Sequence, residues 1–274
     1  MSRKLLFRSA EIITGRLERR FAKTLQTAYE DSYKEITKLL SLANMQYGDL
    51  SNDTLNQRAT IKGRSVTRLI KLEYQLKTEI NKLNRGQPQR FASFLTDSYL
   101  MNRNEITKTI DNVSPIKVNF QILDRKKIYE SAIQPMGKIS LKMNEQATWL
   151  NIQRAMTQSI TQGEGVRDMA TRIQMALRQN GNNALVIART ENTRVSNKAR
   201  LDTFEEAEKK GIKLGKIWIA TGDDRTRDRH IDINGEIKSV DKPFSNGLMC
   251  PGDQTGGDAS ETVNCRCAMG AILL

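Results

Sequence analysis

The sequence predicts a mainly helical α+β protein, with a long N-terminal helical hairpin, a helical segment and a small C-terminal β-containing domain with long loops. Two observations predict this class. Apolar residues recur at helical spacing through much of the N-terminal part, whereas the last fifth of the 274-residue chain is rich in glycine and loses that spacing. The chain is long enough for one large core or two modest ones.

A long first helix is predicted from Leu5 to about Tyr47, a stretch that contains no proline and one glycine. Its apolar and small residues recur at steps of three and four: Leu17, Phe21, Leu25, Ala28, Ser32, Ile36, Leu39 and Ala43. These positions form one face of a nearly straight helix. Gly48 and Asp49 end it.

Two more helices are predicted next. Ser51 can cap the second helix, whose stripe alternates steps of four and three, the heptad pattern. The stripe, interrupted by two charged residues, is Leu55, Ala59, Lys62, Val66, Leu69, Glu73, Leu76, Ile80 and Leu83. Gly86 stops this helix, and Pro88 suits the first turn of a third that runs to about Ile110. Residues 1–112 are therefore predicted to form a basic helical hairpin or stalk.

A strand is predicted after Pro115, which breaks the helical pattern. Apolar residues then alternate with polar ones: Ile116, Val118, Phe120 and Ile122. This period is typical of a half-buried strand, either a lone edge strand or an arm that pairs with another subunit. We assign residues 113–145 to this strand and a connecting segment.

Helices of ordinary length are expected from Asp124 to Gln179, with breaks at 135–137 and 163–165. A turn at 181–183 then precedes a helix over 184–210, which Asn183 caps and the next glycine closes.

Glu191 stands out in that helix because it interrupts a face of small residues, formed by Ala184, Ala188, Val195 and Ala199. A buried carboxylate must be paired or hydrogen-bonded. We expect an ion pair with Arg189, Arg225 or another arginine. The alternative interpretation is a catalytic carboxylate.

A small sheet with long loops is predicted near the C-terminus. Residues 217–220 have the pattern of a buried strand, and 223–227 form a polar loop. Asn234-Gly235 between apolar residues predicts a tight hairpin over 231–237. Residues 244–264 show no regular pattern.

The C-terminal half also carries short motifs in a distinctive order. They are Ala188-Arg189-Thr190-Glu191, Asn197, Arg200, Trp218, Asp224-Arg225-Thr226-Arg227, His230, Gly235, Phe244 and Asn264-Cys265-Arg266-Cys267. This combination resembles the Mu F-like minor head proteins of tailed bacteriophages, the phage head morphogenesis family, over roughly residues 145–270. The resemblance implies such a domain over 146–274, with structural roles for Arg189, Glu191, Trp218, Asp224, Arg225 and Arg227.

What the resemblance implies is a minor capsid protein of the virion, present in multiple copies and assembled in the bacterial host cytoplasm. It would dock on the portal or inner head and act in assembly or DNA ejection. Its expected partners are the portal protein and the major capsid or scaffolding protein. The family is not generally enzymatic, so no enzyme activity is expected. No apolar run approaches the roughly 18–20 residues of a membrane span, so no membrane partner is expected.

Double-stranded DNA is a further expected partner because the net charge of +13 is unevenly distributed. Residues 1–90 hold 18 Lys and Arg against 9 Asp and Glu. Such an excess steers a protein toward nucleic acid or an acidic partner, although a solvated basic helix surface is the alternative. The candidate DNA-binding residues are Arg16, Arg19, Arg20, Lys23, Arg64 and Arg68.

The protein's only histidine, His230, and all three cysteines, Cys250, Cys265 and Cys267, lie in the last fifth of the chain. These residue types suit a structural zinc site, and zinc would stabilise a loop-rich segment that has little apolar material. The alternatives are buried thiols, a disulfide or a catalytic metal. No cofactor other than zinc is suggested.

A second functional hypothesis is a metal-dependent nuclease that uses Asp223, Asp224 and His230 in the loop 223–230. Here the lone histidine would have to serve every catalytic role. The sequence also lacks a nucleophile elbow, a phosphate-binding glycine loop and a His-Glu-x-x-His motif. The structural role is therefore favoured.

Overall fold

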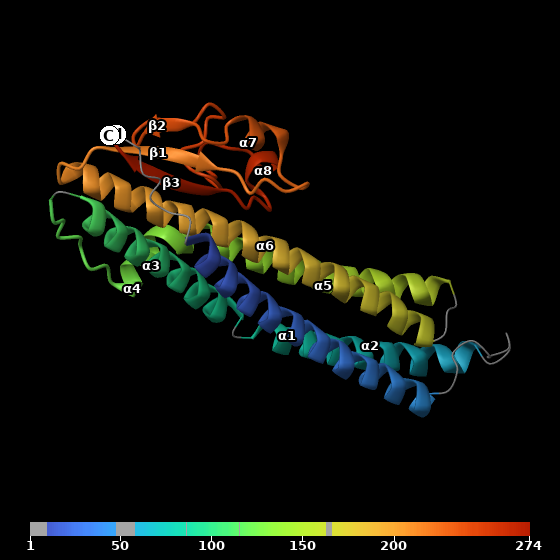
Figure 1. Cartoon of the computed structure of the whole chain (residues 1–274). Helices are drawn as coiled ribbons and strands as arrows, with labels where there is room; N and C mark the ends of the chain where they lie inside the picture. Colours follow the sequence, from blue (N-terminus) through green and yellow to red (C-terminus); the bar gives the residue numbers. More distant parts are fainter. Residues whose placement is uncertain (1–9, 48–57, 86, 115, 163–165) are drawn as a thin grey trace. The chain divides into compact units, whose positions relative to one another are not determined.

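The computed structural model describes residues 10–47, 58–85, 87–114, 116–162 and 166–274 (Figure 1). The chain divides into two compact units. Unit 1 comprises Met1–Ala22, Gln89–Ile139 and Val186–Leu274, and unit 2 comprises Lys23–Pro88 and Ser140–Leu185. Both are built from non-consecutive segments, whereas the sequence analysis divided the chain into consecutive ones. No helix in the described ranges combines the length and apolarity needed to cross a membrane.

Unit 2 is helical and contains parts of α1 (Ala10–Tyr47), α2 (Arg58–Asn84), α5 (Gln134–Thr161) and α6 (Val166–Lys209). Its buried core draws on all four helices: Ile36, Leu40, Leu72, Leu76, Ile80, Leu83, Ile152, Ala155, Met156, Met169, Ile173 and Leu177. Among these are four of the predicted stripe residues, Ile36 of α1 and Leu76, Ile80 and Leu83 of α2, whereas Leu40 is buried in α1 in place of the predicted Leu39. The hairpin is thus stabilised by helices from later in the chain.

The charged residue Glu73 is tolerated in the apolar stripe of α2 because it has a polar partner in the same unit. Gln153 Nε2 on α5 donates a hydrogen bond to Glu73 Oε1 at 3.0 Å. Ser51, the predicted cap of the second helix, lies outside the described residues. The described helix α2 begins at Arg58.

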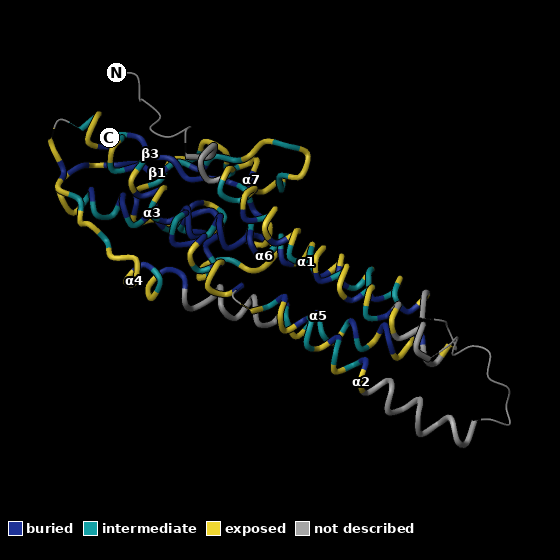
Figure 2. The backbone as a smooth tube through the Cα atoms, turned by 90° about the horizontal axis from the view of Figure 1, so that it is seen from below, coloured by how far each residue is buried: buried dark blue, intermediate teal, exposed yellow. Residues whose placement is uncertain are grey.

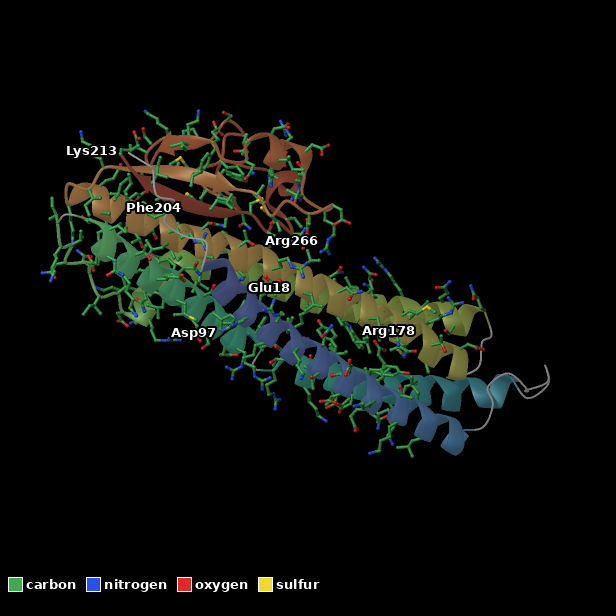
Figure 3. All side chains as sticks on the ribbon, viewed as in Figure 1. Glu18, Asp97, Arg178, Phe204, Lys213 and Arg266 are labelled. Carbon is green, nitrogen blue, oxygen red and sulfur yellow. The ribbon has the colours of Figure 1, made fainter. Side chains whose placement is uncertain are left out.

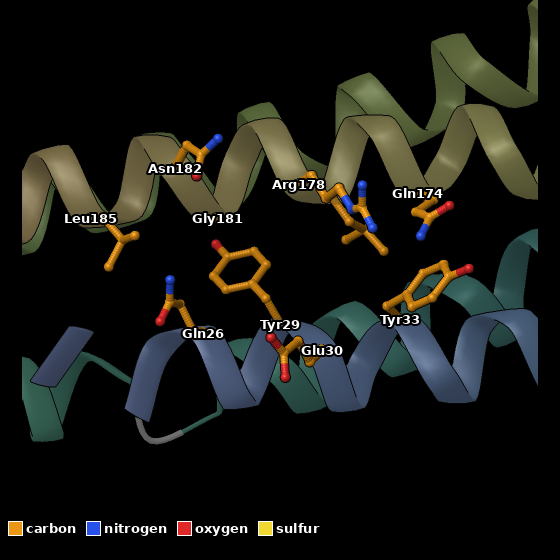
Figure 4. Close-up of a pocket in the computed structure, with 10 residues that line it drawn as sticks. Gln26, Tyr29, Glu30, Tyr33, Gln174, Arg178, Gly181, Asn182 and Leu185 are labelled. Carbon is orange, nitrogen blue, oxygen red and sulfur yellow. The ribbon is translucent and has the colours of Figure 1, made fainter. Parts of the chain in front are cut away.

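Helix α6 runs without a break through Gly181, where a turn was predicted. The prediction failed because packing overrides the weak helix propensity of glycine and asparagine. A Cβ on Gly181 would lie 3.5 Å from Cγ of Tyr29 on α1, and Figure 4 shows this ring facing the helix. The predicted helix break at Pro135 is also absent. The π-helical turn η1 (Tyr129–Ile133) leads directly into α5, which contains Pro135.

We expect Gly181→Ala to raise the free energy of unfolding by about 0.5–1 kcal/mol, since alanine favours the helix interior and its methyl group would only contact Tyr29. Thermal unfolding followed by circular dichroism tests this. Gly211→Ala is the matched control and should destabilise, because Gly211 has φ 89°. A loss of stability in Gly181→Ala would contradict the packing described for Tyr29.

The predicted end of α6 at Gly211 is confirmed. The Ile212 N–H donates to the Ala207 carbonyl at 3.1 Å, and the Gly211 N–H donates to the Glu208 carbonyl at 2.9 Å. This pair of hydrogen bonds defines a Schellman motif, which requires a left-handed residue at the position of Gly211.

Unit 1 places α3 (Gln87–Val113) and the C-terminal part of α6 beside a three-stranded antiparallel sheet (Figure 1). The strands are β1 (Leu214–Ile219), β2 (Ile237–Ser239) and β3 (Ala268–Leu273), in the order β2-β1-β3. Figure 2 shows β1 and β3 as mostly buried. The first turns of α1 also belong to this unit, and the Phe21 ring stacks on Phe94 at a centroid distance of 4.5 Å.

The core of unit 1 lies between the helices and the sheet. It comprises Ile106, Ile110, Val118, Leu201, Phe204, Ala207, Ile212, Leu214, Trp218, Val240, Phe244, Leu248, Cys250, Cys265, Cys267, Met269 and Ala271. The mainly helical α+β class predicted from the sequence is confirmed, including the buried strand around Trp218.

The strand predicted over 116–122 is not formed. These residues are irregular, with a tight turn in which the Phe120 N–H donates to the Val118 carbonyl at 3.0 Å, and they have no sheet partner among the described strands; the short helices α4 (Arg125–Ile128) and η1 follow. Their backbone is instead bound by helix side chains: Arg103 Nη2 donates to the Gln121 carbonyl at 2.9 Å, and Glu206 Oε1 accepts from the Gln121 N–H at 2.8 Å. Val118 is buried and Ile122 is fully exposed, so the alternating apolar residues do not share a buried face. The segment is a strap that is bound to α3 and α6 through its backbone.

The hairpin predicted over 231–237 is also wrong. Residues Asp228–Asp232 form the short helix α7, and β2 pairs with β1. A two-residue hairpin turn would need positive φ at both Asn234 and Gly235, but only Gly235 has it. The segment 244–264 is mainly irregular, as predicted, with one short helix, α8 (Ala259–Thr262).

Candidate metal centre

Four polar residues on one face of α6 bind the backbone that precedes and begins β3. They are Thr190, Thr193, Asn197 and Arg200, at helical steps of three and four. Thr190 Oγ1 accepts from the Asn264 N–H at 2.8 Å, and Thr193 Oγ1 donates to the Cys265 carbonyl at 2.7 Å. This face of α6 therefore positions the segment that carries two of the cysteines.

The other two residues bind the edge of β3 that faces away from β1. Asn197 Nδ2 donates to the Cys267 carbonyl at 3.2 Å, and Asn197 Oδ1 accepts from the Met269 N–H at 2.8 Å. Arg200 Nη1 donates to the Met269 carbonyl at 2.9 Å. An open sheet edge buried under a helix would leave unpaired backbone groups, and these side chains satisfy them.

His230 and two cysteines form a buried cluster beside this edge. His230 Nδ1 lies 3.7 Å from Cys265 Sγ and 3.5 Å from Cys267 Sγ. The other ring nitrogen, Nε2, lies 3.0 Å from Glu261 Oε2. All four side chains are buried, and one ligand atom from each of His230, Cys265 and Cys267 lies within 4.8 Å of the others.

Different elements contribute the members of this cluster. His230 lies on α7, where its ring packs edge-on against Trp218 at a centroid distance of 5.1 Å. Glu261 lies on α8, whose N-cap Asp258 accepts hydrogen bonds from the Ser260 and Glu261 N–H groups. The cluster thus joins two short helices to the start of β3.

The cluster perturbs the acidity of its members. Burial lowers the pKa of His230, but the hydrogen bonds and charges of Cys267 and Glu261 outweigh burial and raise it. The pKa of Cys265 is lowered, chiefly by its hydrogen bonds with Cys267 and against the opposing effect of burial.

A family model described as Phage Mu protein F like protein matches residues 150–270, the segment that contains this face of α6 and the cluster. These residues belong to the phage Mu protein F like family. The predicted resemblance is confirmed for this Mu F-like segment.

Two curated relatives each match a stretch of the chain of about this length. Over 121 residues the chain is 34% identical to minor head protein GP7 of Bacillus phage SPP1, which covers 43% of the chain and 39% of that protein. Over 118 residues it is 34% identical to the NAD(+)--arginine ADP-ribosyltransferase EFV of Enterococcus faecalis, which covers 43% of the chain and 24% of that protein. The matched segment spans less than half of either relative. No solved structure matches the chain.

Glu191 of the Mu F-like segment has the arginine partner that was predicted, although it is neither Arg189 nor Arg225. Arg194 Nε donates to Glu191 Oε2 at 2.9 Å, and Gln254 Nε2 donates to Glu191 Oε1 at 3.2 Å. Arg194 Nη2 lies 2.8 Å from the same Glu191 Oε2 but is not aligned as a hydrogen-bond donor. Both carboxylate oxygens of Glu191 are therefore engaged, and Gln254 connects the pair to the 250–256 loop.

Arg189 instead binds two other segments of unit 1. Its Nε donates to Glu18 Oε1 at 2.8 Å, and its Nη1 donates to Asn264 Oδ1 at 2.8 Å. Figure 3 labels Glu18 on α1. Asn264 has φ 58° and is the one non-glycine residue with positive φ among those described. Arg189 therefore holds the strained residue that begins the Asn-Cys-Arg-Cys motif.

The Asp-Arg-Thr-Arg motif of the Mu F-like segment forms an ion-paired loop. Arg266 binds Asp223 through both terminal nitrogens, and its hydrogen bond is the main cause that lowers the pKa of Asp223. Arg225 lies 3.7 Å from Asp223, and Arg227 donates to the Val263 carbonyl at 2.6 Å. Asp224 is exposed.

The nuclease hypothesis lacks its expected geometry. Asp223 and Asp224 do not join His230 in any metal-binding group among the described residues, and His230 is buried against cysteines and Glu261. The predicted catalytic loop is therefore an arginine-paired structural loop.

Cys250, the fourth predicted zinc ligand, lies outside the cluster. It is a buried free thiol, and burial raises its pKa to about 12. The charged groups that act on it include Lys216, whose Nζ donates to the Met249 carbonyl at 2.7 Å and lies 5.0 Å from the Phe244 ring centroid. Burial lowers the pKa of Lys216.

The role of Glu261 as a partner of His230 was not predicted. One signal was available: Asp258 and Glu261 have the spacing of a capping box, which predicts a short helix at that position. The distance from Glu261 to His230 depends on tertiary packing and leaves no local pattern.

The predicted DNA-binding residues on α1, Arg16, Arg19, Arg20 and Lys23, are all exposed. The side chains of Arg64 and Arg68 lie outside the described residues. The exposed set follows one helix over about two turns, so its members can act on a common partner.

Proposed function

We propose that the protein is a minor head protein of a tailed bacteriophage that docks on the portal or on the inner face of the head. The observation that carries this proposal is the Mu F-like segment over 150–270, shared with a named minor head protein of a phage. The portal protein and the major capsid or scaffolding protein are the proposed partners, and the virion, assembled in the host cytoplasm, is the proposed location.

The test is to purify full and empty particles of the phage that encodes this chain and to quantify the chain by mass spectrometry. We expect several copies per particle, and co-expressed portal protein should co-purify with the chain. Absence of the chain from purified heads, together with no complex with the portal protein, would overturn the proposal.

Contact with packaged DNA is the second element of the proposed function. Arg16, Arg19, Arg20 and Lys23 support it because they are exposed and close together on α1. Phosphate contacts release counterions, so affinity should fall steeply with salt. Each contact contributes about 0.9 to the slope of log affinity against log salt.

We expect replacement of these four residues by alanine to reduce that slope by about 3–4 in fluorescence anisotropy with a double-stranded oligonucleotide. The matched control replaces four exposed lysines elsewhere, Lys117, Lys127, Lys209 and Lys213, with the same change in net charge. Equal effects of the two sets would indicate that net charge, not the α1 residues, determines binding. No binding by the wild-type protein would leave the head proteins as its partners.

The proposed role requires no catalysis. The relative named as an arginine ADP-ribosyltransferase matches this chain over only 24% of its own length. Its name describes the whole relative and not the matched part. Glu191 of the Mu F-like motifs and Asp223, the residue before the Asp-Arg-Thr-Arg motif, are both paired with arginine, whereas Asp224 of that motif is exposed. We therefore propose a structural role.

A further inference from the structure

We infer that His230, Cys265 and Cys267 bind a zinc ion, with Glu261 orienting the histidine. The site does not depend on the role proposed for the whole protein. The three residues are buried, and their candidate ligand atoms lie within 4.8 Å of one another. Two thiolates and an imidazole form a donor set that zinc prefers.

The distances agree with tetrahedral coordination. Zinc binds sulfur at about 2.3 Å and nitrogen at about 2.0–2.1 Å, so a tetrahedral angle places the two donors about 3.6 Å apart. His230 Nδ1 lies 3.5 Å from Cys267 Sγ and 3.7 Å from Cys265 Sγ. A single ring nitrogen cannot form an aligned hydrogen bond with two thiols at once, whereas a metal ion between the three atoms uses both sulfurs.

Glu261 fixes the histidine in the state that such a site requires. Its Oε2 accepts from His230 Nε2 at 3.0 Å, which keeps the proton on Nε2 and directs the Nδ1 lone pair toward the sulfurs. Metal-binding histidines almost always donate their other N–H to a carboxylate or carbonyl. Arg229 Nη1 donates to the second oxygen of Glu261 at 2.8 Å and so fixes that carboxylate.

The cysteine segment is preorganised by α6. Thr193 and Asn197 bind the carbonyls of Cys265 and Cys267, so both Sγ atoms are held by a rigid helix face. The cysteines therefore lie in an irregular segment whose backbone is bound by a helix.

Three protein ligands leave a fourth position for water or a small exogenous ligand. Cys267 also lines a pocket of about 340 Å³, together with Arg266, Thr221 and residues of α1 and α6. An open pocket therefore lies beside one of the ligands. Cys250 does not complete the site because it lies outside the cluster.

The proposed zinc has a clear structural effect. It connects α7 to the start of β3 across the 34 residues between His230 and Cys265, where the described regular structure is limited to the short elements β2 and α8. Closing a long loop stabilises the folded state relative to the unfolded chain.

The first test is to express the full chain without chelator and to measure bound metal by inductively coupled plasma mass spectrometry. We expect one zinc per chain, lost in Cys265→Ser, Cys267→Ser and His230→Ala. The matched control is Cys250→Ser, another buried free cysteine, which should retain one zinc. Cobalt substitution should produce a thiolate-to-cobalt charge-transfer band in the wild type and in Cys250→Ser.

A second measurement keeps the inference testable if the ligand variants fail to fold. Glu261→Ala retains all three ligands and should weaken zinc affinity about 10–100-fold in a competition titration with a chromogenic chelator. Removal of zinc from the wild-type protein should lower its thermal midpoint, and added zinc should restore it.

Three results would each overturn the inference. The first is substoichiometric metal in the wild type with three titratable thiols and no uptake of added zinc. The second is a disulfide between Cys265 and Cys267 in protein purified under reducing and oxidising conditions alike. The third is loss of metal in Cys250→Ser with retention in Cys265→Ser.

Discussion

Replacing Arg194 with methionine is expected to lower the free energy of unfolding by about 3 kcal/mol, because it removes one partner of a buried ion pair. Glu191 is 2% exposed, and its carboxylate would then keep only the amide of Gln254 at 3.2 Å. Arg194 also donates to the Ala132 carbonyl at 2.8 Å, so the variant loses a contact with η1 as well. Methionine retains the aliphatic stem and limits the change in packing.

The measurement uses tryptophan fluorescence during denaturation by urea. The chain has two tryptophans, Trp149 in unit 2 and Trp218 in unit 1. In a Trp149→Phe background the emission reports on unit 1, where the ion pair lies. Arg178→Met is the matched control, because this arginine lies on the same helix with an exposed side chain (Figure 3), and its effect should stay within about 0.5 kcal/mol.

A double variant separates the charge effect from packing. Replacing both Glu191 and Arg194 with methionine removes the uncompensated charge, and such replacements are often neutral. We expect it to recover most of the stability lost in Arg194→Met. A loss below about 1 kcal/mol in the single variant, or no recovery in the double variant, would show that Glu191 finds compensation elsewhere.

The helices were predictable because their signals are local. The α1 and α2 stripes, spaced by three and four, include core residues such as Ile36 and Leu76, both almost fully buried. Gly211 marked the end of α6 correctly because a Schellman motif requires positive φ, which glycine adopts without strain.

The failures share a physical cause, since tertiary contacts overrode local preference. Gly181 lies inside α6 because the Tyr29 ring packs against it, and 116–122 forms a strap because Arg103 and Glu206 bind its backbone. Strand β3 was missed although its apolar sequence could have suggested a buried strand. A short apolar run alone does not distinguish a strand from a helix.

The candidate site could be predicted in part. The clustering of rare residues identified His230, Cys265 and Cys267, but sequence cannot measure which side chains converge. Cys250 lies in the same window and in the same core, and yet it is not part of the cluster. The role of α6 was also only partly visible: its motif residues marked the family, but the structure explains why a helix face carries Thr190, Thr193 and Asn197.

That helix face leads to the second large expected effect. Asn197→Ala should lower the free energy of unfolding by about 2–3 kcal/mol, because it leaves the Met269 N–H and the Cys267 carbonyl without partners. Both groups belong to buried residues at the edge of β3 that does not pair with β1, so no other strand replaces the amide. Arg200 still binds the Met269 carbonyl, which limits the loss.

Asn182→Ala is the matched control, since this asparagine lies on the same helix and is exposed. It should change stability by less than about 0.5 kcal/mol. In the Trp149→Phe background, Trp218 pairs with Met269 in the sheet and therefore reports directly on the affected edge. If Asn197→Ala and Asn182→Ala have equal effects, the β3 edge does not depend on α6. If only Asn197→Ala destabilises, the asparagine of the Mu F-like motif holds the strand that follows the two proposed zinc-binding cysteines.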